Sequence, residues 1–266
     1  MAKRNGRGIM PEGRQAALLE RRNLKMAASA HAYVRGSTAR FYEWLDAADR
    51  VALPEGPDTW ICGDCHLGNL GPVAGADGAL DVQIRDLDQT VVGNPAHDLI
   101  RLGLSLASAA RSSDLPGVAT ARMMERMVEG YERAFEDAGD GPDAASQPAP
   151  VEMAMREAAG RSWKHLADER IEGIEPVIPF GRRFWPLTPE ERQGITEFFA
   201  QEEPKGLVVS LRARNGEADV EVADAAYWRK GCSSLGRARY AVLLRIGQRG
   251  AKPRHCLMDI KEAVAA

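Results

Sequence analysis

The residues best suited to chemistry lie in one short segment, Gly63 to Asn69, with the sequence GDCHLGN. It places the carboxylate of Asp64 and the amide of Asn69 five positions apart in a glycine-rich loop after a predicted strand. In such a loop an aspartate can orient a substrate hydroxyl, and an asparagine can help to hold magnesium against nucleotide phosphates. The spacing favours phosphoryl transfer, with Asp64 and His66 as catalytic candidates. Turn capping by Asp64 and core packing by His66 are the structural alternatives.

An acidic pair follows the segment. Asp86 lies seventeen residues beyond Asn69, just after a predicted strand over residues 80–84, and Asp88 comes two positions later. Carboxylate and amide oxygens are the hard ligands that magnesium prefers. We therefore expect Asn69, Asp86 and Asp88 to be the metal ligands.

Hydrophobic periodicity predicts the elements that position these residues. A short strand over residues 59–62 precedes the loop, and a buried helix begins at Ala96. Further helices are predicted over residues 16–30, 38–48, 118–138 and 151–170, and another begins at the capping Thr188. Strands are predicted over residues 208–211, 220–222, 240–246 and 256–260.

Several sequence blocks together resemble two known groups of proteins. The order GDxHxxN, acidic strand end and GxPxxDL resembles the catalytic core of aminoglycoside and choline phosphotransferases. The chain more closely resembles the bacterial family known as domain of unknown function 2252. The blocks that carry this resemblance are KMAASAHAYVRG, GDCHLGNLG, IRDLDQTVVGNPAHDLIRL, GCSSLGRARYAVLL and LMDIKEA.

The resemblance implies an α+β, protein-kinase-like fold, with a helical catalytic lobe over residues 1–200 and a small antiparallel β-sheet over residues 201–266. Asp64 would be the catalytic aspartate, and Asn69 and Asp86 would hold Mg2+. ATP would be the co-substrate, and its γ-phosphoryl group would pass to a hydroxyl of a small molecule or a protein. Asp98 would be structural.

The same resemblance assigns nucleotide binding to the last part of the chain. The predicted phosphate-binding residues are Gly231, Ser233, Ser234, Gly236 and Lys261. A P-loop is a poor alternative, because Arg237 and Ala238 replace its required lysine and hydroxyl residue. In ordinary kinases the glycine turn precedes the catalytic loop, so the order here implies a circularly permuted and truncated kinase. Because no helix with a partner glutamate follows Lys261, a pseudokinase-like nucleotide-binding or scaffold module is the alternative function.

Composition and charge limit the classes of protein to which the chain can belong. The 35 basic and 38 acidic side chains give a net charge of -3, which does not favour nucleic-acid binding. No apolar run is long enough for a membrane span and no export signal is visible, so we expect a cytoplasmic protein.

Cys62, Cys65 and His66 form a CxxCH pattern, for which buried thiols are expected and haem, metal or redox use is the alternative. Arg35 is expected to pair with Asp86 or Asp88, and contact with a phosphate is the alternative.

Overall fold

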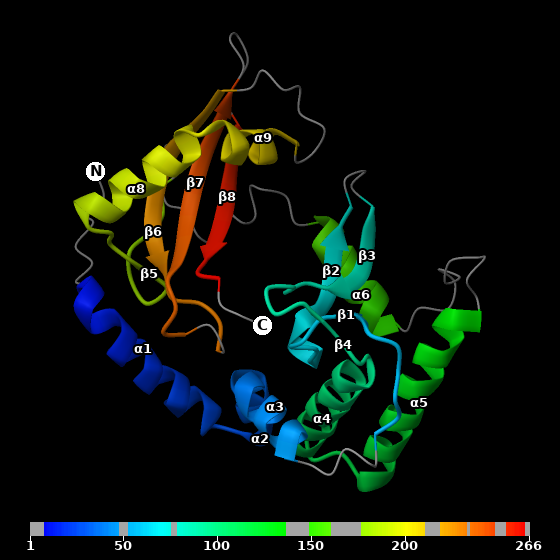
Figure 1. Ribbon diagram of the computed structural model, residues 1–266. Coiled ribbons are helices and arrows are strands. Elements are labelled where there is room, and N and C mark those ends of the chain that lie inside the picture. The colour runs from blue at the N-terminus through cyan, green and yellow to red at the C-terminus, as the bar shows by residue number, and fades with distance from the viewer. Residues whose placement is uncertain are drawn as a thin grey trace. The chain divides into compact units, whose positions relative to one another are not determined.

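The computed structural model describes residues 8–47, 53–75, 79–136, 149–160, 177–210, 219–232, 235–247 and 254–263. It has the mixed α+β composition predicted from the sequence (Figure 1). Among these residues, none of the helices combines the length and the apolar composition that crossing a bilayer requires. Contacts divide the chain into two compact units. The helical unit is built on Glu20–Val73 and Leu80–Ala158, and the sheet unit on Met1–Leu19 and Ala159–Glu262. The division into lobes at residue 200 stays a prediction.

The sheet unit contains a four-stranded antiparallel sheet in the order β5, β6, β7, β8. The strands are β5 (Phe184–Trp185), β6 (Asp219–Trp228), β7 (Arg239–Gly247) and β8 (Arg254–Lys261). The small antiparallel sheet is thereby confirmed. The predicted strands 220–222, 240–246 and 256–260 are confirmed as well, and each is longer than the sequence indicated.

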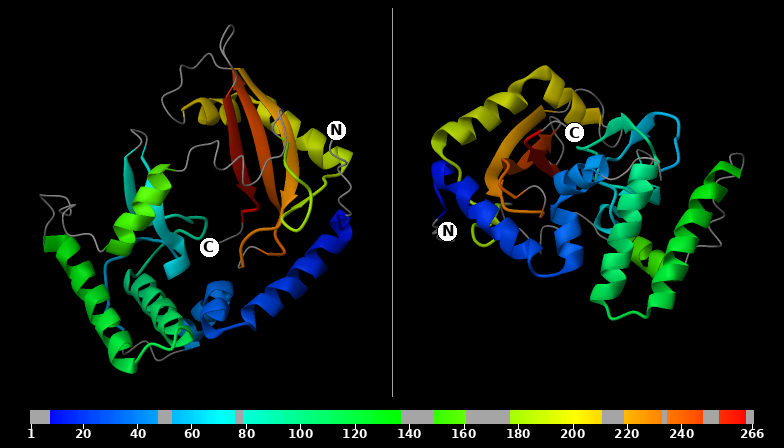
Figure 2. Two further views of the ribbon diagram at one scale, coloured as in Figure 1. Left: turned by 180° about the vertical axis from the view of Figure 1, so that it is seen from behind. Right: turned by 60° about the horizontal axis from the view of Figure 1, so that its bottom comes forward.

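Helices α8 (Pro189–Ala200) and α9 (Glu202–Ser210) cover one face of this sheet (Figure 1). Seen from behind, the strands lie in front of both helices, which therefore cover only that face (Figure 2, left). The predicted start of α8 is confirmed. The Thr188 side chain accepts a hydrogen bond from the backbone N–H of Glu191, and the Glu191 carboxylate accepts one from the backbone N–H of Thr188.

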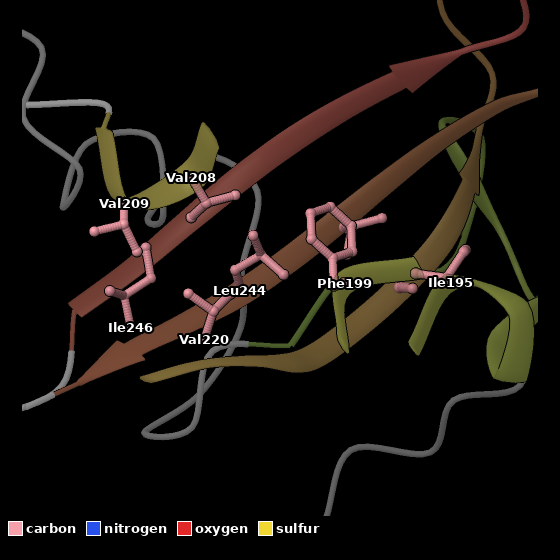
Figure 3. Packing of buried hydrophobic residues seen from close by; sticks show 9 residues of the cluster. Ile195, Phe199, Val208, Val209, Val220, Leu244 and Ile246 are labelled. Carbon is pink, nitrogen blue, oxygen red and sulfur yellow. The ribbon is translucent and has the colours of Figure 1, made fainter. Parts of the chain in front are cut away.

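The predicted strand over residues 208–211 is wrong, because residues 208–210 belong to α9 and Leu211 lies outside the described residues. Val208 and Val209 are adjacent and both buried. A strand would point neighbouring side chains to opposite faces, whereas a helix separates them by about 100° and can bury both in one wide stripe. Figure 3 shows these valines packed with Val220, Leu244 and Ile246 of the sheet. Tertiary packing overrides the strand preference of the valine pair.

Strand β7 is apolar on both faces. Val242 and Leu244 pack toward the helices, while Ala241 and Leu243 belong to a second buried cluster with Trp228. Such a strand is buried on both sides and explains the nearly continuous apolar sequence AVLL.

The helical unit combines helices with two small sheets. Its elements are α2 (Ala30–Gly36), α3 (Thr38–Ala47), β1 (Thr59–Ile61), the 3-10 helix η2 (Leu67–Asn69), β2 (Leu70–Ala74), β3 (Leu80–Ile84), β4 (Val91–Gly93), α4 (Ala96–Ser112), α5 (Gly117–Glu136) and α6 (Ala149–Gly160). Strand β1 pairs antiparallel with β4, and β2 pairs with β3. These elements confirm the predicted strands at 59–62 and 80–84 and the helices that begin near residues 38, 96, 118 and 151.

The first helix of the structure begins and ends at other residues than the helix predicted over residues 16–30. Helix α1 spans Pro11–Met26, and the chain turns before α2 begins at Ala30. Ser29 caps α2, because its side chain accepts a hydrogen bond from the backbone N–H of Ala32 at 3.0 Å. The predicted helix over residues 16–30 therefore begins five residues and ends four residues earlier than expected, and Ser29 starts a separate helix that was not predicted.

Candidate functional site

The loop that follows β1 has a conformation that only glycine allows at its second position. Gly63 has a φ of +74°, in the left-handed region. A Cβ at this residue would lie 2.1 Å from the backbone oxygen of Gln89, which is far too close for any side chain. The segment after β3 therefore packs directly on the loop.

Asp98, in the first turn of α4, fixes the start of the loop. Its two carboxylate oxygens accept hydrogen bonds from the backbone N–H groups of Cys62, at 2.6 Å, and Gly63, at 3.0 Å. Burial raises the pKa of Asp98, and the two backbone hydrogen bonds oppose this shift without cancelling it. The phenol of Tyr42 donates to the backbone oxygen of Gly63 at 2.8 Å, and burial together with the Asp98 carboxylate raises the pKa of Tyr42 to about 12. These bonds give Asp98 a structural role.

Asp64, the central candidate, is buried and paired with a buried arginine. Its Oδ1 accepts hydrogen bonds from Arg101 Nε at 2.9 Å, Arg101 Nη2 at 2.6 Å and Thr38 Oγ1 at 2.8 Å. Arg101 is fully buried on α4 and also donates to the backbone oxygen of Val34 at 3.0 Å. Oδ1 therefore links the loop to α3 and α4. Oδ2 lies 3.8 Å from Nε2 of His66. Any chemistry of this carboxylate must use Oδ2.

His66 and Asn69 complete the loop. His66 is 4% exposed, and burial lowers its pKa, although the Asp64 carboxylate favours the protonated ring. The Asn69 side chain is also buried and donates from Nδ2 to the backbone oxygen of Asp64 at 2.9 Å. Because the nitrogen makes this bond, the amide oxygen is the atom left to bind a cation or accept a hydrogen bond.

The acidic pair lies just beyond β3, in the segment that packs on the loop. The Cys62 thiol donates to the backbone oxygen of Asp86 at 3.8 Å, so this residue is adjacent to the start of the loop. Asp86 is half-buried and Asp88 is exposed. Within the described ranges, no group of three His, Cys, Asp or Glu side chains could hold a metal ion by itself. A magnesium site here would need the Asn69 amide, or oxygen atoms of a ligand, beside these carboxylates.

The CxxC cysteines are buried free thiols, and all four cysteines are free. A hydrogen bond between Cys62 and Cys65 lowers the pKa of the Cys62 thiol, and the same bond together with burial raises the pKa of Cys65. Both side chains are buried, with exposures of 4% and 6%. This environment agrees with the expected packing role.

The predicted phosphate-binding residues are in the sheet unit. Gly231 and Gly236 lie in the connection between β6 and β7 with φ values of +92° and +101°. Lys261 ends β8 directly opposite Arg239, the first residue of β7. The structure therefore brings Lys261 to the end of the sheet that carries the glycine connection. Ser233 and Ser234 lie outside the described residues.

A reciprocal pair of hydrogen bonds joins β8 to this connection. The backbone N–H of Ala238 donates to Glu262 Oε2 at 2.7 Å, and the backbone N–H of Glu262 donates to the oxygen of Ala238 at 2.8 Å. The glycine connection is thereby held beside the end of β8, where Lys261 lies.

Comparison with known proteins now places the sequence in a family. Residues 14–266 match DUF2252, which is described as an uncharacterized protein conserved in bacteria. The chain belongs to DUF2252. No curated protein and no solved structure matches it. The family resemblance of the sequence blocks is thus confirmed.

Two residues on α4 of this DUF2252 chain that hold the loop were not predicted from the sequence. They are Arg101, which pairs with Asp64, and Ser105, whose hydroxyl accepts a hydrogen bond from the backbone N–H of Leu67 at 3.1 Å. With Asp98 they follow the helical spacing i, i+3, i+7 on α4. This polar stripe lies beside the apolar one and could have been found in the block HDLIRLGLS.

Proposed function

We propose that this DUF2252 protein is a kinase-like phosphotransferase that moves the γ-phosphoryl group of ATP to a hydroxyl of a small molecule or a protein. The observation that supports this most strongly is the loop from Gly63 to Asn69. Hydrogen bonds from α3 and α4 hold it in place, and it keeps one carboxylate oxygen of Asp64 outside the ion pair with Arg101. Catalysis of phosphoryl transfer depends mainly on such positioning.

In this proposal each loop residue has one task. Oδ2 of Asp64 orients the acceptor hydroxyl, and His66, 3.8 Å from that oxygen, helps to set its orientation. Since Oδ1 is held by Arg101 and Thr38, the carboxylate cannot rotate without breaking these bonds. The reacting oxygen is therefore fixed before the substrate binds.

Magnesium fits the donor atoms near the loop. The amide oxygen of Asn69 and the carboxylates of Asp86 and Asp88 are hard ligands, and the ion would neutralise charge on the transferred phosphoryl group. Magnesium commonly uses one or two carboxylates and completes its coordination with water and nucleotide phosphates. Such a site does not require three protein carboxylates.

The nucleotide phosphates would meet the glycine connection and Lys261 of the sheet unit. The positive φ values at Gly231 and Gly236 allow backbone N–H groups to approach an anion closely. An ammonium group at the end of the neighbouring strand adds the charge that phosphates require. A kinase-like fold with its glycine turn after the catalytic loop is part of the same proposal.

Magnesium-dependent nucleotide binding provides the first test. ATP would be titrated into the whole chain by calorimetry, with Mg2+ or with EDTA, for the wild type, Asp86→Ala and Asp81→Ala. Asp81 is an exposed residue of β3 and serves as the matched control. We expect magnesium-dependent binding in the wild type and the control, and a loss of about tenfold or more for Asp86→Ala. Equal binding by all three proteins would overturn the metal assignment.

Turnover requires a separate measurement. ADP formation from ATP would be followed by chromatography with a panel of hydroxyl acceptors, using the wild type and Asp86→Ala. Acceptor-dependent ADP formation that disappears in Asp86→Ala is the expected result. The absence of magnesium-dependent ATP binding in the wild type would overturn the proposal.

A nucleotide-binding module without turnover is the second candidate. The observation that favours it is the buried ion pair between Asp64 and Arg101, because a carboxylate can be retained for folding alone. Magnesium-dependent binding of ATP without ADP formation would select this module over the enzyme.

A further inference from the structure

Four nitrogen atoms near the loop are buried and lack a hydrogen-bond partner among the residues that the structure describes. They are Nδ1 of His31, Nε of Arg35, Nδ1 of His66 and Nη1 of Arg101. Two of these side chains are almost completely buried, His66 at 4% exposure and Arg101 at 0%. A buried hydrogen-bonding atom without a partner costs about 1–3 kcal/mol, so four in one region need an explanation.

The four side chains come from α2, the loop and α4, and several contacts place them together. His31 and Arg35 are four residues apart on α2 and therefore lie on the same face of the helix. Nε of Arg35 lies 2.8 Å, and Cε1 of His66 3.1 Å, from the position that a Cβ on Gly68 would occupy. Arg101 donates to a backbone oxygen of α2, so its guanidinium is also next to this helix. The absent side chain at Gly68 is what lets Arg35 approach the loop.

The charge in this region is positive. Arg101 is compensated by Asp64, whose Oδ1 it contacts at 2.6 Å. The Arg35 guanidinium is an additional positive charge, and Arg35, Arg101 and His31 all act electrostatically on His66. The Asp64 carboxylate lies 3.8 Å from His66 and is already bound to Arg101. The expected ion pair of Arg35 with Asp86 or Asp88 is not among the ion pairs of the described residues.

This combination selects an anion rather than a metal ion. A guanidinium group only donates hydrogen bonds and cannot ligate a cation, whereas it binds oxyanions well. A histidine ring N–H can also donate a hydrogen bond to an oxyanion. A tetrahedral oxyanion has enough acceptor oxygens to meet several converging donors.

We propose that α2 and the loop after β1 form a binding site for a phosphate group, with Arg35 and His66 as its principal ligands and His31 and Arg101 as additional donors. The phosphate could be the terminal group of a nucleotide or that of a phosphorylated small molecule, since both present the same oxygens. The site does not depend on turnover, so it can exist even if the protein proves to be a module without catalytic activity.

Inorganic phosphate is the probe for the first experiment. It would be titrated into the full chain by calorimetry, comparing the wild type with Arg35→Gln and Arg40→Gln. Arg40 is the matched control, because it is an exposed arginine of α3 whose Nη1 contacts Glu43 at 2.9 Å. We expect Arg35→Gln to bind phosphate about 10- to 100-fold more weakly, the effect of losing a charge-assisted hydrogen bond, and Arg40→Gln to bind as the wild type.

Gly68→Ala tests the same site without removing a charge. The added methyl group would displace the flexible end of Arg35 and leave the backbone in place, because its nearest neighbours are side-chain atoms. We expect weaker phosphate binding with an unchanged circular dichroism spectrum. Failure of the wild type to bind phosphate at millimolar concentration, or equal binding by the wild type and Arg35→Gln, would overturn the site.

Competition distinguishes the two sources of the phosphate. ATP, ADP and glycerol 3-phosphate would each compete with inorganic phosphate in the presence of Mg2+. Competition by ATP but not by ADP would identify the terminal phosphate of the nucleotide, and competition by glycerol 3-phosphate but not by ATP a phosphorylated small molecule. Both results support the site, which is measured without any turnover.

Discussion

Arg101, fully buried on α4, donates two hydrogen bonds to the same carboxylate oxygen of Asp64, from Nε at 2.9 Å and from Nη2 at 2.6 Å. One oxygen of the candidate catalytic residue is thereby used for stability, and the other remains for chemistry. A change at either residue should affect folding as well as function, so the two effects have to be measured separately.

Arg101→Met should destabilise the protein by about 3–5 kcal/mol, because the buried Asp64 carboxylate would lose its counter-charge. Urea unfolding would measure this. Arg40→Met, at an exposed pair on α3, should change the stability by less than about 1 kcal/mol. The double variant Arg101→Met with Asp64→Leu should recover much of the loss, since it removes both charges. Equal effects of Arg101→Met and Arg40→Met would contradict the structural role of the pair.

Gly63→Ala should cost more than about 2 kcal/mol, because the residue has a positive φ and its new Cβ would meet the backbone oxygen of Gln89 at 2.1 Å. Gly130→Ala, on α5, is the matched control, since no atom lies within 4 Å of its Cβ position. We expect the control to stabilise the helix by about 0.5–1 kcal/mol. Thermal unfolding of both variants would test this, and a neutral Gly63→Ala would show that the loop can move away from Gln89.

Asp98 should make the stability depend on pH. Burial raises its pKa in the folded state above the ordinary value of 3.8, so between these two values the folded chain holds more protons than the unfolded chain. The contribution of Asp98 to stability should therefore be fully present below pH 3.8 and decline as the pH rises through the raised pKa. Asp98→Asn removes this titration, so the stability difference between wild type and variant should shrink as the pH rises. Urea midpoints at a series of pH values would measure it, and a difference that grows with pH would be the opposite result.

The buried thiols should be protected from alkylation in the folded protein. Cys62 and Cys65 are 4% and 6% exposed, whereas Cys232 and Cys256 are half-buried. Treatment with iodoacetamide, followed by peptide mass spectrometry, should label Cys62 and Cys65 at least about tenfold more slowly than the other two, because the reagent needs access to the sulfur. In urea all four should react alike. Fast labelling of Cys62 or Cys65 without denaturant would show that the loop opens readily.

The position of the loop could be predicted because its signals are local. A short apolar strand followed by glycines and polar residues indicates a strand and a tight loop, and the structure has both. The partners that hold the loop could not be read in the same way. Thr38 lies 26 residues before Asp64 and Arg101 lies 37 residues after it. Such contacts depend on how the helices pack, which hydrophobic spacing alone does not specify.

In helix α4, too, hydrophobic spacing predicts the element but not the residues that it buries. Its leucines predict the helix correctly, but none of them is buried and Leu104 is exposed. The side chains that are buried include the polar Arg101 and Ser105, with Asp98 half-buried beside them. A charged residue in a helix is usually assigned to solvent, and that assumption fails where a buried carboxylate lies opposite.

The three residues of α4 that bond to the loop also determine which changes in chain length the protein can tolerate. Inserting one residue between positions 98 and 101 would rotate everything after it by about 100° and detach both later contacts from the loop. An insertion beyond position 105 would leave all three in register. Natural or engineered variation in length should therefore accumulate in the later turns of the helix, while its first three turns keep a fixed residue count.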